Sequence, residues 1–133
     1  MPFPAVHPAL DRALLNKGYA EPTPVQAAVL EGEHAERDLL VSAQTGSGKT
    51  VAFGLAGAPT LLGDKPVFRP GGAPLCLAVA PTRELAMQVA AELQWLYADS
   101  GAKIATCVGG MGARREARGL GFGVHLVVGT PGR

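Results

Sequence analysis

Residues 43–50 read Ala43-Gln44-Thr45-Gly46-Ser47-Gly48-Lys49-Thr50, and the apolar run Leu39-Leu40-Val41 comes shortly before them. A strand that turns through glycines into a helix opening with Lys and Thr gathers several backbone N–H groups around one anion. The stretch therefore predicts a phosphate-loop and a site for a nucleoside triphosphate. Ala43 stands where the general pattern has a glycine, but no ligand contact depends on that first residue.

The chemistry of the loop predicts a role for each part. The N–H groups of Thr45 to Lys49 can surround the β-phosphate, and the positive end of the following helix favours an anion there. Lys49 brings a charge to the β and γ oxygens, and the hydroxyl of Thr50 is placed to ligate Mg²⁺. Hydrolysis also needs acidic residues that orient water. No strand followed by paired acids occurs after the loop in this chain.

The composition describes a globular chain of one domain. Its 133 residues are enough for one buried core, and 47% hydrophobic with 17% charged residues exclude a disordered chain. The sequence contains neither an apolar run of 18 residues nor a basic segment followed by an apolar stretch. It therefore predicts neither a membrane span nor a secretory signal, and we expect a cytoplasmic protein without a membrane partner.

Apolar spacing and chain breakers divide the sequence into alternating helices and strands. Helices are predicted at residues 7–17, from Pro24, after the phosphate-loop through Phe53, at 83–98 and near 112–119, and strands at 38–42, 75–80, 103–108 and 124–129. The stretch from Gly57 to Ala73, rich in Gly and Pro, is expected to be a connection. Within the helix at 83–98, the predicted core face carries Leu85, Val89, Leu93 and Leu96. Apolar strands separated by helices indicate an α/β fold, doubly wound, with helices on both faces of a parallel sheet.

The segment Gly18–Gln26 offers an aromatic ring and an amide ahead of the phosphate-loop. The side chain of Gln26 has a donor and an acceptor, which can pair with the adjacent N6–H and N7 groups that distinguish adenine from guanine. Tyr19 could stack on the base. The alternative is structural, with a Tyr that anchors a loop and a Gln in the exposed first turn of a helix.

Two later junctions have one design, because each ends a strand with a Thr that can cap a helix and an Arg close by. They read Pro81-Thr82-Arg83-Glu84-Leu85 and Thr130-Pro131-Gly132-Arg133. The carboxyl ends of parallel strands form the edge where ligands bind, so both junctions should meet the phosphate-loop there. Gly109-Gly110 would let a polymer backbone approach closely. Helix capping and a flexible turn explain each feature alone, but together they favour a track for sugar-phosphate oxygens of a nucleic acid.

Basic residues gather in the last part of the chain. Residues 103–133 carry five basic residues and one acidic residue, whereas the first 102 carry seven basic and ten acidic residues. This distribution favours a C-terminal third that faces phosphates. The alternative for Arg114, Arg115 and Arg118 is the solvated face of a short helix.

In their order and spacing, these residues resemble the DEAD-box RNA helicases over essentially the whole chain. Residues 18–26 are similar to the family's Q motif, 43–50 to motif I, 81–85 to motif Ia, Gly109-Gly110 to the GG element, and 130–133 to motif Ib. Phe3 is similar to the isolated upstream aromatic residue that supports nucleotide binding. The chain departs from the family at Glu31 and Glu36, where Pro and Gly are usual, and we expect local variation only.

The resemblance implies the N-terminal RecA-like domain of an ATP-dependent RNA helicase, with ATP and Mg²⁺ as cofactors and RNA as partner. A second, C-terminal RecA-like domain of the same protein would close with it on RNA and separate a short duplex. Phe3, Tyr19 and Gln26 would hold the nucleoside end of ATP, and Lys49 and Thr50 its phosphates and metal. The implied RNA contacts are Pro81, Thr82, Arg83, Gly109, Gly110, Thr130, Pro131, Gly132 and Arg133.

The family's Asp-Glu-Ala-Asp and Ser-Ala-Thr motifs do not occur in these 133 residues. We therefore expect the chain to bind nucleotide without turning over ATP or unwinding RNA by itself. Two other functions stay open: a DNA-directed helicase of the same superfamily 2, and a nucleotide-binding module that acts by docking without catalysis. The RNA substrate is not predicted, because contacts to phosphate carry no sequence information.

Overall fold

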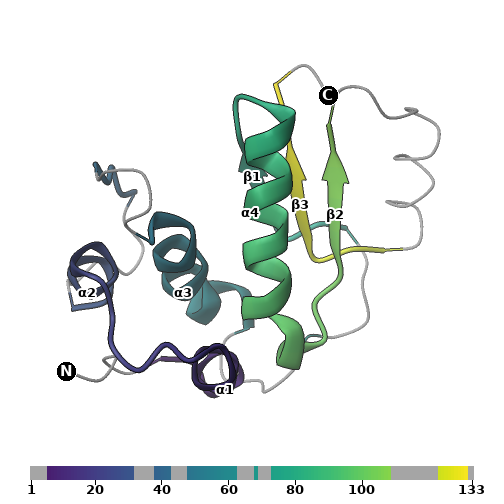
Figure 1. Ribbon diagram of the computed structural model, residues 1–133. Helices are drawn as coiled ribbons and strands as arrows, with labels where there is room; N and C mark the ends of the chain where they lie inside the picture. Colours follow the sequence, from purple (N-terminus) through teal and green to yellow (C-terminus); the bar gives the residue numbers. More distant parts are fainter. Residues whose placement is uncertain are drawn as a thin grey trace.

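The computed structural model describes residues 6–31, 38–42, 48–62, 68, 73–108 and 123–131. Its elements are α1 (Pro8–Lys17), α2 (Pro24–Glu31), α3 (Lys49–Leu62), β1 (Cys76–Val79), α4 (Arg83–Leu96), the 3₁₀ turn η1 (Ala98–Ser100), β2 (Ile104–Cys107) and β3 (Leu126–Gly129). The helices gather on one side of a small sheet (Figure 1). In these ranges no helix is both long enough and apolar enough to span a bilayer.

The sheet is parallel and its strands follow the order β1-β3-β2. Val127 of β3 is level with Leu77 of β1 and with Ala105 of β2. Every residue of β3 is buried, which is typical of the central strand of a parallel sheet. The parallel sheet, with α4 between β1 and β2, and the helices that pack beside it confirm the predicted α/β class. The helix predicted near 112–119 lies outside the described residues.

Helix α4 covers one face of the sheet. Its buried face carries Ala86, Ala90, Leu93 and Leu96. The prediction was wrong for Leu85, which is 41% exposed, because the small side chains of Ala86 and Ala90 face the sheet and turn Leu85 outward. On the opposite face of the sheet, Leu77 and Val79 are 67% and 63% exposed, so the described residues cover that face only in part.

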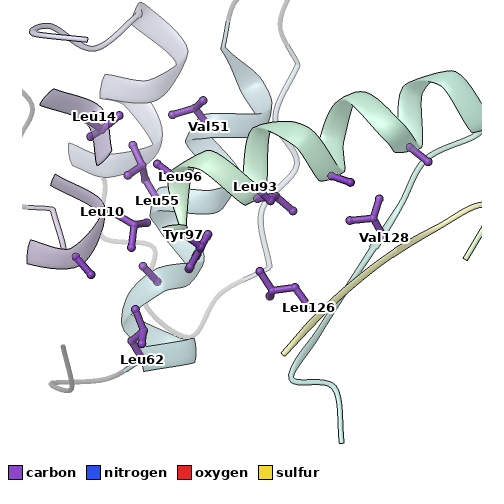
Figure 2. Close-up of a cluster of buried hydrophobic side chains, with 14 of the residues drawn as sticks. Leu10, Leu14, Val51, Leu55, Leu62, Leu93, Leu96, Tyr97, Leu126 and Val128 are labelled. Carbon is purple, nitrogen blue, oxygen red and sulfur yellow. The ribbon is translucent and has the colours of Figure 1, made fainter. Parts of the chain in front are cut away.

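Helices α1 and α3 pack around the C-terminal half of α4, and α2 packs against α3. Leucines from α1 and α3 surround Leu96 and Tyr97, as the close-up of the core shows (Figure 2). Burial of one leucine side chain stabilises a fold by roughly 1.5–3 kcal/mol. This cluster therefore fixes α3, the helix that follows the phosphate-loop, against α4, the helix that follows β1.

The segment 38–42, predicted to be a strand, has no regular secondary structure. Leu40 is fully exposed and Leu39 is 41% exposed. A strand needs a hydrogen-bonded neighbour for its backbone groups, and the sheet of the described residues contains no strand beside this segment. The prediction was therefore wrong, because an apolar run does not by itself provide a pairing partner.

Helix α3 is longer than the sequence predicted. Gly57 and Pro59 indicated a connection from residue 57, yet the helix continues to Leu62. Ala58 and Leu62 extend the buried stripe that Val51 and Leu55 begin, and packing of that stripe outweighs the low helix propensity of Gly and Pro. Pro59 is on the exposed side of the helix.

Candidate functional site

The end of the phosphate-loop leads directly into α3. Gly48 has a positive φ of 89°, and Lys49 is the first residue of the helix. The amide of Ala52 donates to the carbonyl of Gly48 at 3.0 Å, which closes the first helical turn. Lys49 and Thr50 are both half-buried in that turn. The loop residues from Ala43 to Ser47 lie outside the described residues.

Gln26, in the first turn of α2, is buried against this loop end, with only 5% of its surface exposed. Its carbonyl oxygen Oε1 accepts from the amide of Thr23 at 2.9 Å. Its nitrogen Nε2 donates to the carbonyl of Gly48 at 3.3 Å. One side chain therefore joins the start of α2 to the residue that precedes Lys49. The alternative interpretation, an exposed Gln in a first turn, is wrong because Gln26 is buried.

Gly48 has no room for a side chain. A Cβ atom there would collide with the Nε2 atom of Gln26 and would lie 3.1 Å from the hydroxyl oxygen of Thr23. Its positive φ also disfavours any residue with a Cβ. The motifs did not predict this contact, because nothing in a pattern along the chain pairs Gln26 with a residue 22 positions later.

Tyr19 packs within the protein. Its ring centroid lies 5.5 Å from that of Trp95 on α4, with the two planes tilted by 58°. The ammonium of Lys17 lies 5.4 Å from the centroid of the same Trp95 ring. This is the anchoring role that the sequence left open as an alternative, and Tyr19 is still 42% exposed. Stacking of Tyr19 on a base stays a prediction.

The two Thr-Arg junctions begin at neighbouring strands. The amide of Ala80, just after β1, donates to Gly129 at the end of β3 at 3.0 Å. The amide of Thr130, just after β3, donates to Cys107 at the end of β2 at 3.1 Å. All three strands therefore end at one edge of the sheet (Figure 1), as predicted.

Helix α4 starts at this edge with a side-chain cap. The hydroxyl of Thr82 accepts from the amide of Leu85 at 3.2 Å, and the backbone of Thr82 is extended. Pro81, Thr82 and Arg83 are exposed. At the second junction, Pro131 is exposed and Thr130 is half-buried.

Several predicted site residues lie outside the described residues: Phe3, Gly109, Gly110, Gly132 and Arg133, together with Arg114, Arg115 and Arg118 of the basic C-terminal third. Lys103, the remaining basic residue of that third, precedes β2. It therefore lies at the edge of the sheet opposite to Thr82 and Thr130.

The described loop end fits a polyphosphate. The first turn of α3 contains no acidic residue, and it carries the ammonium of Lys49 and the hydroxyl of Thr50. Backbone N–H groups of a first turn point out of the helix, and the helix dipole adds positive potential there. A glycine with positive φ lets the chain turn tightly into that end. The arrangement is suited to hold a phosphate chain and to place an oxygen ligand beside it for Mg²⁺.

The family model and the relatives that match this chain all name helicases. The sequence pattern of the DEAD/DEAH box helicase family matches residues 23–133. The ATP-dependent RNA helicase RhlB of Citrobacter koseri is 40% identical over 130 residues, which are 97% of this chain and 31% of that protein. The ATP-dependent RNA helicase SrmB of Haemophilus influenzae is 43% identical over 126 residues, 95% of this chain and 28% of that protein. The chain thus spans less than a third of the length of these curated relatives.

Two solved structures have a fold similar to that of this chain. A DEAD box protein from the hyperthermophile Methanococcus jannaschii gives a TM-score of 0.82 at 30% identity, covering 98% of this chain and 34% of that chain. The RNA helicase Prp28 from Chaetomium thermophilum, solved bound to ADP, gives a TM-score of 0.77 at 37% identity, covering 94% of this chain and 30% of that chain.

Proposed function

Because this chain belongs to the DEAD/DEAH box helicase family, we propose that it forms the nucleotide-binding part of an ATP-dependent RNA helicase. The observation that carries the proposal is the hydrogen bond from Gln26 Nε2 to the carbonyl of Gly48. This bond supports the proposal because it joins the amide of Gln26 to the residue that precedes Lys49. The RecA-like fold shared with solved DEAD box proteins agrees with this arrangement.

In this proposal, each described residue of the site binds a different part of ATP. Lys49 holds the β and γ oxygens by charge, and the first-turn N–H groups of α3 bind the same phosphates. The Thr50 hydroxyl would ligate Mg²⁺, and bound Mg²⁺ offsets the negative charge of the phosphates. The bond to Gly48 uses one of the two side-chain N–H groups of Gln26, and the bond from the Thr23 amide uses one lone pair of its carbonyl oxygen. Gln26 would present its second N–H and the remaining lone pair to adenine.

The edge at which the three strands end would bind the RNA backbone. Thr82 and Arg83 begin α4 there, and Thr130 and Pro131 follow the neighbouring strand β3. A helix N-terminus with an exposed Arg is suited to phosphate oxygens, and such contacts hold a strand without reading its sequence. Unwinding in the whole protein would follow when a second RecA-like domain closes on the same strand.

Equilibrium binding of Mg·ADP and Mg·ATP, measured by isothermal titration calorimetry, tests the proposal. The Lys49→Ala variant should bind at least about tenfold more weakly, because charge-assisted contacts to phosphate are lost. Lys103→Ala removes the same charge from the opposite edge of the sheet and should bind like the wild type. Gln26→Ala should lower the preference for ATP over GTP. Equal affinities for the wild type and Lys49→Ala would refute the nucleotide site.

A further inference from the structure

Helices α3 and α4 touch at a position where α3 has no side chain. A Cβ atom on Gly54 would lie 2.5 Å from Cδ2 of Leu96 and 3.3 Å from Cδ2 of Leu93. Glycine at this position therefore lets the leucine side chains of α4 pack directly against the backbone of α3. The contact joins the helix that begins at Lys49 to the helix that begins after Thr82.

Tyr97 closes the same contact from the end of α4. It is 2% exposed, and its hydroxyl donates to the main-chain carbonyl of Gly54 at 2.6 Å. Figure 2 shows its ring at the end of α4, beside α3. Gly54 follows Lys49 by five residues, which is about 7.5 Å along a helix axis. The hydroxyl of Tyr97 therefore binds the backbone of α3 close to the N-terminal end of that helix, where Lys49 and Thr50 lie.

The hydroxyl of Tyr97 restricts sliding and rotation between α3 and α4, which the ring alone does not. Apolar packing resists separation of two helices, but it permits small sliding and rotation because it is not directional. A hydrogen bond to one carbonyl fixes both the depth and the rotation of α3 against α4. A phenylalanine would fill the same volume without this constraint.

We propose that Tyr97 is a positioning residue for the phosphate end of α3, acting through its hydrogen bond to Gly54. The bond fixes the first turn of α3 relative to α4, so that Lys49 can reach the phosphate oxygens and Thr50 the Mg²⁺ ion. The assignment rests on the proposed function, because it requires that α3 binds a nucleoside polyphosphate.

The test compares the affinities of AMP and ADP, each with Mg²⁺, for the 133-residue chain. The dissociation constant of AMP divided by that of ADP, here called the AMP/ADP ratio, measures the contact with the β-phosphate. The contribution of the nucleoside is common to both ligands and cancels. Tyr97→Phe should reduce this ratio by about threefold to tenfold, the range that one lost hydrogen bond spans. Lys49→Ala should reduce it further, as the positive control.

Ser100→Ala is the matched control, because it also removes a buried hydroxyl. Ser100 Oγ donates to the carbonyl of Tyr97 at 2.6 Å and accepts from the amide of Ala102, so its bonds stay at the end of α4. This variant should lower thermal stability and leave the AMP/ADP ratio unchanged. Gly54→Ala pushes the helices apart from the other side of the contact and should lower the ratio even though it keeps Tyr97.

The outcomes separate the two ideas. A wild-type chain that binds ADP, together with a Tyr97→Phe variant that keeps the full AMP/ADP ratio, overturns the positioning role and leaves the proposed function standing. If Ser100→Ala lowers the AMP/ADP ratio as much as Tyr97→Phe does, the positioning role is also overturned, because the decrease would then be explained by lower stability alone. A wild-type chain that binds no ADP contradicts the proposed function itself.

Discussion

At the scale of single residues, the sequence predicted that Lys49 and Thr50 begin a helix, but it did not predict the contacts that the residues around them make. Lys49 and Thr50 occupy the first turn of a helix, as the glycine-rich pattern predicts. The bond between Gln26 and Gly48 was not predictable, because it depends on how α2 packs beside α3. Tyr19 lies on Trp95 for the same reason, since α1 and α4 meet only in the folded chain.

Gly48→Ala should destabilise the fold and weaken nucleotide binding. The left-handed backbone costs a residue with a Cβ roughly 1–2 kcal/mol, and the collision with Gln26 adds to that cost. Gly18→Ala is the matched control, because Gly18 has a φ of 86° but a Cβ atom there would meet nothing within 4 Å. Urea unfolding measures both losses. An equal decrease in the free energy of unfolding for the two variants would show that a Cβ atom at position 48 does not collide with Gln26.

Tyr97 should make stability depend on pH in the alkaline range. Burial raises the pKa of its hydroxyl, and the nearby Cys76 thiolate raises it further. Below about pH 10 the hydroxyl is neutral in both the folded and the unfolded chain, so its full contribution to the free energy of unfolding is present. Above that pH the unfolded chain ionises while the folded chain does not, so stability falls by up to about 1.4 kcal/mol per pH unit.

Thermal unfolding of the wild type and Tyr97→Phe between about pH 8 and 11, values chosen around the ordinary Tyr pKa of about 10, isolates this contribution. The difference in stability between the two proteins should shrink as pH rises, because only the wild type loses the contribution of Tyr97. Parallel curves for the two proteins would contradict it.

At the scale of elements, helix and strand positions were largely predictable, and the errors have physical causes. Residues 57–62 continue α3 because their apolar stripe packs against the core, which outweighs Gly57 and Pro59. The apolar segment 38–42 remains outside the sheet, because no described strand pairs with it. Buried faces and pairing partners belong to the tertiary structure, and a local pattern cannot supply them.

The start of α4 should bind a nucleic-acid backbone by charge. Arg83→Ala should weaken binding of a single-stranded RNA and reduce the slope of its salt dependence by about one ion. Arg12→Ala removes an exposed Arg that pairs with Asp99 at 3.6 Å, near the other end of α4, and it should have no such effect. Fluorescence anisotropy at several salt concentrations gives both slopes. A preference for DNA over RNA of the same sequence would favour a DNA-directed helicase.

At the scale of the whole molecule, the fold carries both the proposed nucleotide site and the proposed backbone-binding edge on one α/β scaffold. The face of the sheet opposite to α4 leaves Leu77 and Val79 mostly exposed, although parallel sheets are normally covered on both sides. The chain also spans less than a third of its curated relatives, at 31% and 28% of their lengths. In the proposed function, these residues would therefore contribute binding steps.

The 133-residue chain should accordingly bind ATP without RNA-stimulated turnover. Its sequence has no Asp-Glu-Ala-Asp motif to hold Mg²⁺ and orient water after the phosphate-loop. A phosphate-release assay with and without RNA measures this directly, with Lys49→Ala as the blank for contaminating ATPase. Release that RNA accelerates in the wild type and not in Lys49→Ala would contradict the expectation.

The central claim is that one site, built by Gln26 and the first turn of α3, receives the nucleotide. Titration of the ¹⁵N-labelled chain with Mg·ADP, followed by amide NMR spectra, tests it most directly. The largest shift changes should fall on the backbone amides of Gly48, Lys49 and Thr50 and on the side-chain amide of Gln26. Saturable shifts that leave these four groups unchanged and gather elsewhere would contradict it.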